Sequence, residues 1–268
     1  MTVPIALTIA GSDSSGGAGI QADLKSFAAQ RVYGASVITA LTAQNTQGVT
    51  AIHAVPPAII RAQMEAVFDD LAVKAIKIGM LGNRETISAV ADGLMARECP
   101  FIVLDPVMVA QSGAALIDDG AVEALIADLF PRALLVTPNL PEAARLVGGV
   151  MAHDEGEMAA QGRIILERGA RAVLVKGGHG SGDMATDILV TRAGVARFSA
   201  PRLLARNTHG TGCSLSSAIA ALLARGLTLE EAVGQAKTWL SGAIARAGEL
   251  DVGQGAGPIH HFHELWGR

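Results

Sequence analysis

The chain has 268 residues, half of them hydrophobic and only 3% aromatic, and its formal net charge is −4 at pH 7. Acidic and basic residues are mixed, with no basic stripe that could neutralise a phosphate backbone, so we expect no nucleic-acid partner. The start of the chain lacks the basic region of a signal peptide, no apolar run is long enough to span a membrane, and Cys99 and Cys213 are the only cysteines, so we expect a cytoplasmic protein without a membrane partner.

Short aliphatic runs alternate with helix-period segments along the chain. The runs predict buried parallel strands at residues 5–9, 75–78, 101–104, 134–137 and 172–175. Apolar spacing predicts helices over roughly 16–31, 57–71, 85–97, 120–130, 141–147, 155–168, 213–225 and 229–247. Residues 188–191 and 195–199 predict an edge hairpin around Arg192-Ala193-Gly194. No linker, charge block or repeat divides the pattern, which indicates one doubly wound α/β domain over residues 1–268.

Polar motifs follow the predicted strands at the points where those strands end. In open parallel sheets, ligands bind beyond the carboxyl ends of the strands. The pattern therefore predicts one site at this rim, built from Gly11-Ser12-Asp13, Gly79-Met80-Leu81, Asp105-Pro106, Pro138-Asn139 and Lys176-Gly177-Gly178.

The first glycine-rich loop, residues 11–19, matches neither common nucleotide motif. A Walker A loop needs Lys and then Ser or Thr after its second glycine, whereas Gly17-Ala18 follows Gly16 here. Gly17-x-Gly19-x-x-Ala22 fits a dinucleotide fingerprint, but no acidic residue stands about 20 residues further on. A plain connecting turn and close approach of the backbone to a ligand remain open, and we favour the ligand.

The second glycine-rich loop, residues 207–213, runs directly into a predicted helix. Unpaired amides at such a helix start suit the charge that develops on a transferring phosphoryl group, although an ordinary helix start is the alternative. Four polar residues lie between the two loops and could serve a triphosphate with magnesium: Asp105, Asn139, Glu142 and Lys176. Glu142 could equally be a helix cap, and we favour the ligand role.

Taken together, these motifs resemble the hydroxymethylpyrimidine/phosphomethylpyrimidine kinases of thiamin biosynthesis, a branch of the ribokinase-like superfamily. The resemblance is nearly full length and rests on blocks at residues 10–25, 42–46, 77–81, 104–108, 137–142, 175–179 and 207–213. It implies a three-layer α/β/α fold with a central, mostly parallel sheet and an antiparallel edge hairpin. It also implies a homodimer.

The resemblance assigns roles to individual residues. It implies that Gln44 recognises the pyrimidine ring, since its amide can both donate and accept hydrogen bonds. It implies a ring pocket that also includes Gly11, Ala18, Asp23, Met80 and Val107. It implies that Asp105 and Glu142 act near Mg²⁺. It implies that ATP is bound by Asn139, Lys176, Thr211 and Gly212. It also implies that catalysis at the γ-phosphate depends on Lys176 and on the loop residues Gly210, Thr211, Gly212 and Cys213.

The implied activity is ATP-dependent phosphorylation of 4-amino-5-hydroxymethyl-2-methylpyrimidine to its monophosphate and then to its diphosphate. Pyridoxal kinase activity is the alternative, and a non-catalytic heterocycle-binding protein is the rival from another class. Cys213 stands where most ribokinase-like enzymes carry a catalytic Asp, and a helix start could lower the pKa of its thiol enough for it to act as a base. Three late histidines, His260, His261 and His263, could suggest a metal site, which we disfavour because no other ligands accompany them.

Overall fold

One mixed β-sheet runs through the part of the chain that the computed structural model describes, residues 3–95, 97, 99, 101–109, 117–180, 182–203, 205 and 207–266. It has nine strands in the order β3-β2-β1-β4-β5-β6-β7-β8-β9. The strands are β1 (Ile5–Asp13), β2 (Tyr33–Asn45), β3 (Gly48–Ala54), β4 (Val73–Ile78), β5 (Phe101–Leu104), β6 (Leu135–Val136), β7 (Ala172–Val175), β8 (Met184–Thr191) and β9 (Val195–Pro201).

The sheet is parallel in its centre and antiparallel at both edges. Adjacent strands from β2 through β1 and β4 to β7 pair in parallel, whereas β3 pairs antiparallel to β2, and β8 and β9 extend β7 as an antiparallel hairpin. This arrangement confirms the predicted mostly parallel sheet with its edge hairpin. The topology switches direction at β1, whose neighbours β2 and β4 lie on opposite sides, and ligand sites form at such switch points.

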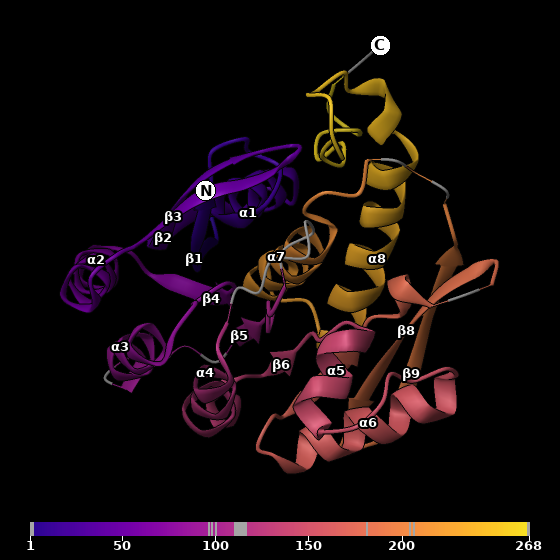
Figure 1. Cartoon of the computed structure of the whole chain (residues 1–268), viewed down its shortest axis with the longest axis horizontal. Coiled ribbons are helices and arrows are strands. Elements are labelled where there is room, and N and C mark those ends of the chain that lie inside the picture. Colours follow the sequence, from indigo (N-terminus) through magenta and orange to yellow (C-terminus); the bar gives the residue numbers. More distant parts are fainter. Residues whose placement is uncertain are drawn as a thin grey trace.

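Helices cover both faces of the sheet, which gives the three layers (Figure 1). One face carries α1 (Gly19–Ala29), α7 (Thr211–Ala224) and α8 (Leu229–Ala245). The other carries α2 (Pro57–Asp70), α3 (Arg84–Met95), α4 (Asp119–Ala124), α5 (Leu140–Val147) and α6 (Glu155–Glu167). The helix predicted over 120–130 is α-helical only to Ala124 and continues as a π-helical turn, Leu125–Leu129.

Central strands are apolar on both sides because they contribute to two hydrophobic cores. In β1, Leu7 and Ile9 pack with the core beneath α2–α6, whereas Ala6 packs with the core beneath α1, α7 and α8. In β7, Val173 and Leu174 divide in the same way. Side chains alternate across a strand, so helices on both faces require a continuous apolar run rather than an alternating one.

The hairpin of β2 and β3 has no counterpart in the sequence prediction. Residues 50–54 of β3 are exposed, so the strand lacks the apolar signal that marks the central strands. Beyond the end of β3, the side-chain amide of Gln63 completes the edge of β2: it accepts from the Ile38 amide at 2.9 Å and donates to the Ile38 carbonyl at 3.1 Å.

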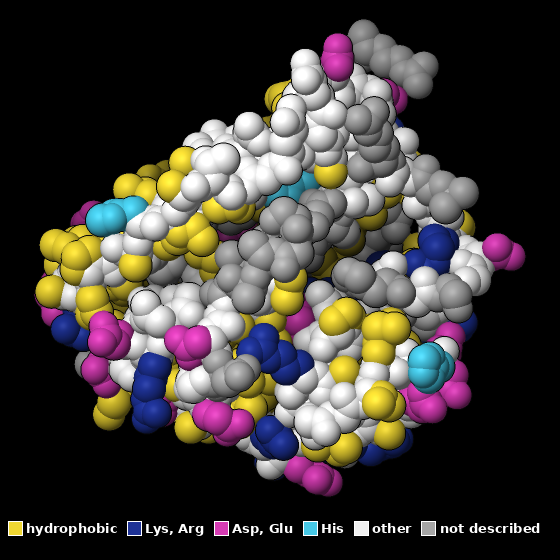
Figure 2. Space-filling model, in the orientation of Figure 1, with side chains coloured by type: hydrophobic (Ala, Val, Ile, Leu, Met, Phe, Trp, Pro, Cys, Tyr) yellow, Lys and Arg dark blue, Asp and Glu magenta, His cyan; other side chains and the backbone are white. Residues whose placement is uncertain are grey.

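The surface carries mixed charges and several exposed apolar side chains. Figure 2 shows basic and acidic side chains interspersed on one face, and hydrophobic side chains gathered at the end where α2 lies in Figure 1. At this end Ile52 of β3 and Ile59 of α2 are each 52% exposed. Among the described residues, no helix is both long enough and apolar enough to cross a membrane.

Candidate functional site

A cavity of about 840 Å³ opens at the carboxyl ends of the parallel strands. Its walls come from residues that follow β1, β4, β5, β6 and β7, together with the first turn of α7. This is the rim at which the sequence predicts a site. The predicted site residues that line it are Gly11, Ala18, Gln44, Met80, Asp105, Val107, Asn139, Glu142, Lys176, Gly210, Thr211, Gly212 and Cys213.

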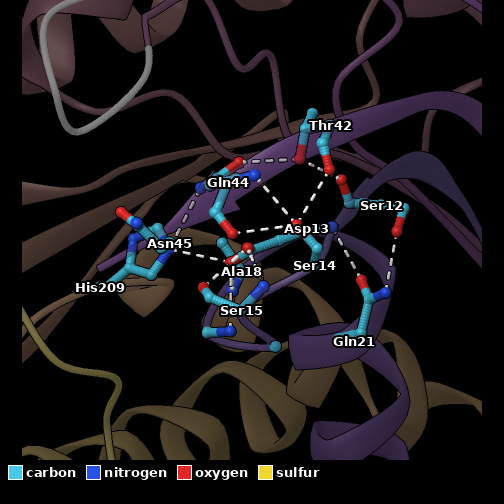
Figure 3. Close-up of polar contacts among 12 residues, drawn as sticks. Ser12, Asp13, Ser14, Ser15, Ala18, Gln21, Thr42, Gln44, Asn45 and His209 are labelled. Carbon is cyan, nitrogen blue, oxygen red and sulfur yellow. Dashed lines mark hydrogen bonds and ion pairs between the residues drawn. The ribbon is translucent and has the colours of Figure 1, made fainter. Parts of the chain in front are cut away.

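The carboxylate of Asp13 organises the loop between β1 and α1 (Figure 3). Its Oδ1 accepts hydrogen bonds from the amide and hydroxyl of Ser15 at 2.9 and 2.7 Å. Its Oδ2 accepts from the Ala18 amide at 2.8 Å and lies 2.9 Å from Nε2 of His209. Burial opposes ionisation of Asp13, but the hydrogen bonds from His209, Ser15 and Ala18 outweigh it and hold its pKa well below the usual range. Asp13 is therefore a carboxylate at neutral pH.

Contact between the two glycine-rich loops accounts for part of their glycine content. A side chain at Gly17 would collide with the ring of His209, and one at Gly210 would collide with the carbonyl of Gly17. Gly19 and Gly210 also have left-handed φ angles of +54° and +79°. These glycines are thus needed for the two loops to pack together, whether or not a ligand approaches them.

Gln44 lies near the end of β2, where a bulge shifts the β2–β3 register between Ala43 and Gln44. The Ser14 hydroxyl accepts a hydrogen bond from the backbone N–H of Gln44 at 2.9 Å and lies 2.9 Å from the backbone carbonyl oxygen of Gln44. The Thr42 hydroxyl donates to the Ser12 carbonyl at 2.7 Å and lies 3.2 Å from Oε1 of Gln44. A β-bulge changes the direction in which nearby side chains point, and bulges are common beside binding sites. The bulge at Gln44 therefore helps to set the direction of the Gln44 side chain.

Apolar atoms surround this end of the cavity. Met80 and Val107 line it, and the main chain of Met80 is fixed by a hydrogen bond of 2.8 Å from the Thr39 hydroxyl to its carbonyl. Gly11 lies so close that a side chain there would collide with the Met80 methyl group. The register of β1 shifts between Ala10 and Ser12, which turns this part of the strand toward the cavity.

Asp23 lies beneath the cavity and does not line its wall. Its carboxylate is fully buried and accepts from Nζ of Lys77 at 2.8 Å, from the Thr8 hydroxyl at 2.6 Å and from the Ser217 hydroxyl at 2.7 Å. Burial lowers the pKa of Lys77, but the charge of Asp23 outweighs this effect and raises that pKa above its usual value. The structure therefore separates Asp23 from the other predicted ring contacts and shows it holding Lys77, a cavity-lining residue that sequence reasoning missed.

Lys176, Asp105 and Glu142 form a buried charged cluster at another part of the wall. Nζ of Lys176 lies 2.7 Å from Oδ1 of Asp105, which also accepts from the Thr137 hydroxyl at 3.1 Å. Burial raises the pKa of Glu142 to about 7; Lys176 opposes this effect and Asp105 adds to it. A Cβ at Gly212 would lie 3.3 Å from Nζ of Lys176, so the start of α7 adjoins this cluster.

Asn139 and Glu142 also cap α5. The Asn139 side chain accepts from the Glu142 amide at 2.9 Å, and the Glu142 carboxylate accepts from the Asn139 amide at 2.8 Å. The helix-cap alternative for Glu142 is thus confirmed as its structural role. Its position beside Lys176 and Asp105 leaves the magnesium role as a prediction.

The second glycine-rich loop forms the start of α7, as predicted. Gly210 is the N-cap residue, and the Thr211 hydroxyl donates to the Thr208 carbonyl at 2.6 Å. Amides in the first turn of a helix have no carbonyl partners within that helix and carry the positive end of its dipole. In α7 the residues of this turn, Thr211, Gly212 and Cys213, line the cavity.

The thiol of Cys213 is more basic than the sequence suggests. Burial raises its pKa to about 11, with Lys77 opposing the effect and Asp23 and Asp105 adding to it. The expected lowering of this pKa by the helix start is therefore wrong in the unliganded protein, because burial and the carboxylates outweigh the positive charges. At neutral pH the sulfur is a thiol.

A C-terminal strap, residues 253–263, ties together the segments that carry Gln44 and the start of α7. The Gly255 amide donates to the Thr46 hydroxyl at 3.1 Å, just beyond the end of β2. The His209 amide donates to the Gly257 carbonyl at 3.1 Å, next to a bridge between His209 and Pro258. The strap therefore holds the end of β2 and the second glycine-rich loop next to each other.

The histidines of the strap serve packing. Nε2 of His261 lies 2.8 Å from the buried hydroxyl of Ser214, in the first turn of α7. Burial lowers the pKa of His261 to about 3, so this ring is neutral. His261 and His263 lie against Trp239. Within the described ranges, no His, Cys, Asp or Glu residues cluster in a way that could hold a metal ion.

Comparison with known proteins agrees with this geometry. The profile of the phosphomethylpyrimidine kinase family matches residues 13–260. A hydroxymethylpyrimidine/phosphomethylpyrimidine kinase of Rhizobium meliloti is 60% identical over 262 residues, 98% of each chain. A thiamine biosynthesis bifunctional protein of Geobacter sulfurreducens is 52% identical over 256 residues, 96% of this chain and 52% of that protein. The ADP complex of Bacillus subtilis pyridoxal kinase superposes with a TM-score of 0.91 at 33% identity, covering 98% of this chain and 99% of that one.

Proposed function

Because the chain belongs to the phosphomethylpyrimidine kinase family, we propose that it phosphorylates 4-amino-5-hydroxymethyl-2-methylpyrimidine from ATP and then phosphorylates the monophosphate, as a step of thiamin biosynthesis. The observation that carries this proposal is the cavity at the carboxyl ends of the parallel strands. It joins the carboxamide of Gln44, which lies 3.2 Å from the Thr42 hydroxyl and 3.3 Å from the His209 ring, to a lysine–carboxylate cluster and a helix start. The proposed ring contact, Gln44, and the proposed phosphate-binding groups thus line the same cavity.

In the proposed reaction the hydroxymethyl oxygen attacks the γ-phosphorus of ATP. A new oxygen–phosphorus bond forms, the bond to the ADP oxygen breaks, and the hydroxyl proton is released. The first-turn amides of α7 and the ammonium of Lys176 suit the negative charge on the transferring group. A loose phosphoryl-transfer transition state asks little of a base, which accords with a Cys213 that remains a thiol.

The carboxylates of Asp105 and Glu142 fit the proposed binding of Mg²⁺. This ion is usually held by one or two carboxylates together with substrate phosphates and water, rather than by a cage of protein ligands. Asp105 and Glu142 line the cavity and offer such carboxylates, with Lys176 beside them. Bound Mg²⁺ would neutralise charge on the triphosphate, and Asn139 would border the nucleotide.

We assign the two phosphorylations to one site because, among the described residues, one cavity is lined by both Gln44 and the start of α7. Purified enzyme with limiting pyrimidine and excess ATP should accumulate the monophosphate first and the diphosphate later, followed by chromatography. Absence of the diphosphate after full conversion to monophosphate would contradict the second step, and absence of any ADP release would contradict the kinase assignment itself.

Pyridoxal kinase activity is the second candidate. The fold match to a pyridoxal kinase supports it, since that enzyme also phosphorylates a hydroxymethyl group on a nitrogen heterocycle. Initial rates of ADP release over a panel of hydroxymethylpyrimidines and pyridoxine vitamers separate the two. We expect the pyrimidine to have the higher kcat/KM, and a higher value for pyridoxal would reverse the assignment.

We further propose a homodimer of single-domain kinases acting in the cytoplasm. The described strands belong to one sheet, and β3 leaves an outer edge flanked by exposed Ile52 and Ile59. Free thiols at Cys99 and Cys213 accord with a reducing compartment. Light scattering after size exclusion should give twice the chain mass, and Ile52→Lys should lower it; a monomer mass for the wild type at all concentrations would contradict the dimer.

A further inference from the structure

The proton on the ring of His209 is fixed by Asp13. The Asp13 carboxylate is 2% exposed and ionised, so it can only accept hydrogen bonds. Nε2 of His209 lies 2.9 Å from it and must therefore carry a proton and donate it. The position of the ring is fixed as well, by the backbone bond from His209 to Gly257 and by the contact with Gly17.

This proton decides which way the carboxamide of Gln44 faces. Figure 3 draws the carboxamide nitrogen of Gln44 at 3.3 Å from Nε2 of His209. Nε2 gives its one proton to Asp13 and has no lone pair with which to accept from an NH₂ group, so the two ends of the carboxamide must be exchanged and the oxygen must face His209. The other end lies 3.2 Å from the Thr42 hydroxyl, whose single proton is given to the Ser12 carbonyl at 2.7 Å. Thr42 can then only accept, so the NH₂ group belongs at that end. Both neighbours demand the same orientation, and Figure 3 shows the side chains converging.

We propose that His209, with its ring proton set by Asp13, is the positioning residue that orients the carboxamide of Gln44 and thereby makes the cavity select one order of donor and acceptor on the heterocycle edge. The inference rests on the proposed function in taking Gln44 as the contact to the pyrimidine ring.

The heterocycle edge that the cavity selects follows from the hydrogen-bonding groups of the Gln44 carboxamide that remain for a ligand. With its oxygen toward His209 and its nitrogen toward Thr42, the Gln44 carboxamide has one lone pair and one N–H left for a ligand. A 4-aminopyrimidine offers the complement, an amino donor beside a ring-nitrogen acceptor. In the 4-oxo analogue the same edge carries a carbonyl acceptor beside an N–H donor. Because the hydroxymethyl group must point to the phosphate end, that ring cannot turn over, and its binding requires a reversed amide.

The test compares kcat/KM for the two substrates, 4-amino-5-hydroxymethyl-2-methylpyrimidine and its 4-oxo analogue, in wild type and His209→Phe. Phe keeps a flat ring against Gly17 but has no N–H, so the amide can turn. We expect the preference for the amino substrate to fall roughly tenfold, about the worth of one hydrogen bond, with the KM for ATP unchanged. His153→Phe, at an exposed position before α6, is the matched control and should keep the wild-type preference.

A double-mutant cycle separates positioning from general loosening of the fold. In a Gln44→Leu background there is no amide to orient, so His209→Phe should change neither kcat/KM nor the preference further. Equal losses for both substrates in both backgrounds would overturn the role of His209 while leaving Gln44 as the ring contact. If Gln44→Leu alone left the KM of the pyrimidine unchanged, the ring contact assumed by the proposed function would fail, and this inference with it.

Nitrogen NMR of the ring gives a readout that does not depend on activity. We expect the His209 proton on Nε2 in the unliganded wild type. Asp13→Asn removes the ionised acceptor and should shift that population toward Nδ1. A wild-type ring protonated only at Nδ1 would overturn the inference.

Discussion

Replacing Lys77 by Met should destabilise the protein more than most single substitutions. The ammonium of Lys77 and the carboxylate of Asp23 are both 0% exposed and lie 2.8 Å apart. Met fills a similar volume but leaves the Asp23 charge buried, and within the described part of the chain the Thr8 and Ser217 hydroxyls are its remaining hydrogen-bond partners. Removing one member of such a pair costs about 3–5 kcal/mol, because the remaining charge can neither reach water nor find a new counter-charge.

Urea unfolding followed by circular dichroism measures this cost, and a second variant tests its cause. Adding Asp23→Asn to Lys77→Met removes the stranded charge but keeps an acceptor, so the double variant should recover at least about 2 kcal/mol of the loss. Asp69→Asn breaks a pair with the same 2.8 Å separation whose side chains are 34% and 67% exposed, and it should have little effect. A loss under about 1 kcal/mol for Lys77→Met, or a double variant no more stable than the single, would refute the reasoning.

Three further expectations concern the rest of the site. Cys213→Ala keeps the α7 amide and removes a protonated thiol, so kcat should stay within about threefold of wild type in steady-state assays, under about 1 kcal/mol of barrier; a hundredfold fall would make the sulfur the base. Burial raises the pKa of Glu142 to about 7, so the folded state holds a proton that the unfolded chain releases. The free energy of unfolding should therefore fall as pH rises from about 5 to 7, by up to about 3 kcal/mol, and Glu142→Gln should remove this fall, whereas an unchanged pH profile would contradict it. Ser214→Ala leaves Nε2 of buried His261 without its 2.8 Å partner and should cost about 1–3 kcal/mol in urea unfolding at pH 7, and an unaltered midpoint would mean that another group replaces the hydroxyl.

The central sheet and its covering helices are readable from the sequence because burial on both faces leaves a direct trace. Strands such as β7 must be apolar at every position, and the helices must be apolar at every third or fourth. The hairpin of β2 and β3 leaves no such trace, because exposed positions in β3 impose no hydrophobic pattern. The bulge at Gln44 cannot be predicted from the sequence either, because it depends on the register between β2 and β3 rather than on the residues of one strand.

Some site residues can likewise be predicted from the sequence, and others cannot. Groups attached to strand ends, such as Asp105 and Lys176, are brought together by topology alone, so a strand assignment suffices to place them. Pairings between distant residues are different. Lys77 with Asp23 and His209 with Asp13 depend on which side chains face each other after folding, and spacing along the chain carries no information about that. The prediction of a lowered Cys213 pKa is wrong for the same reason, since this pKa reflects burial and neighbouring carboxylates.

The position of the strap in the sequence bears on how the site comes into being during translation. Residues 253–263 are synthesised after every strand and after both glycine-rich loops, yet they hold Thr46, His209 and Ser214 in place. A domain generally folds as a unit, so the loops around the cavity can reach their final arrangement only after the strap has emerged from the ribosome.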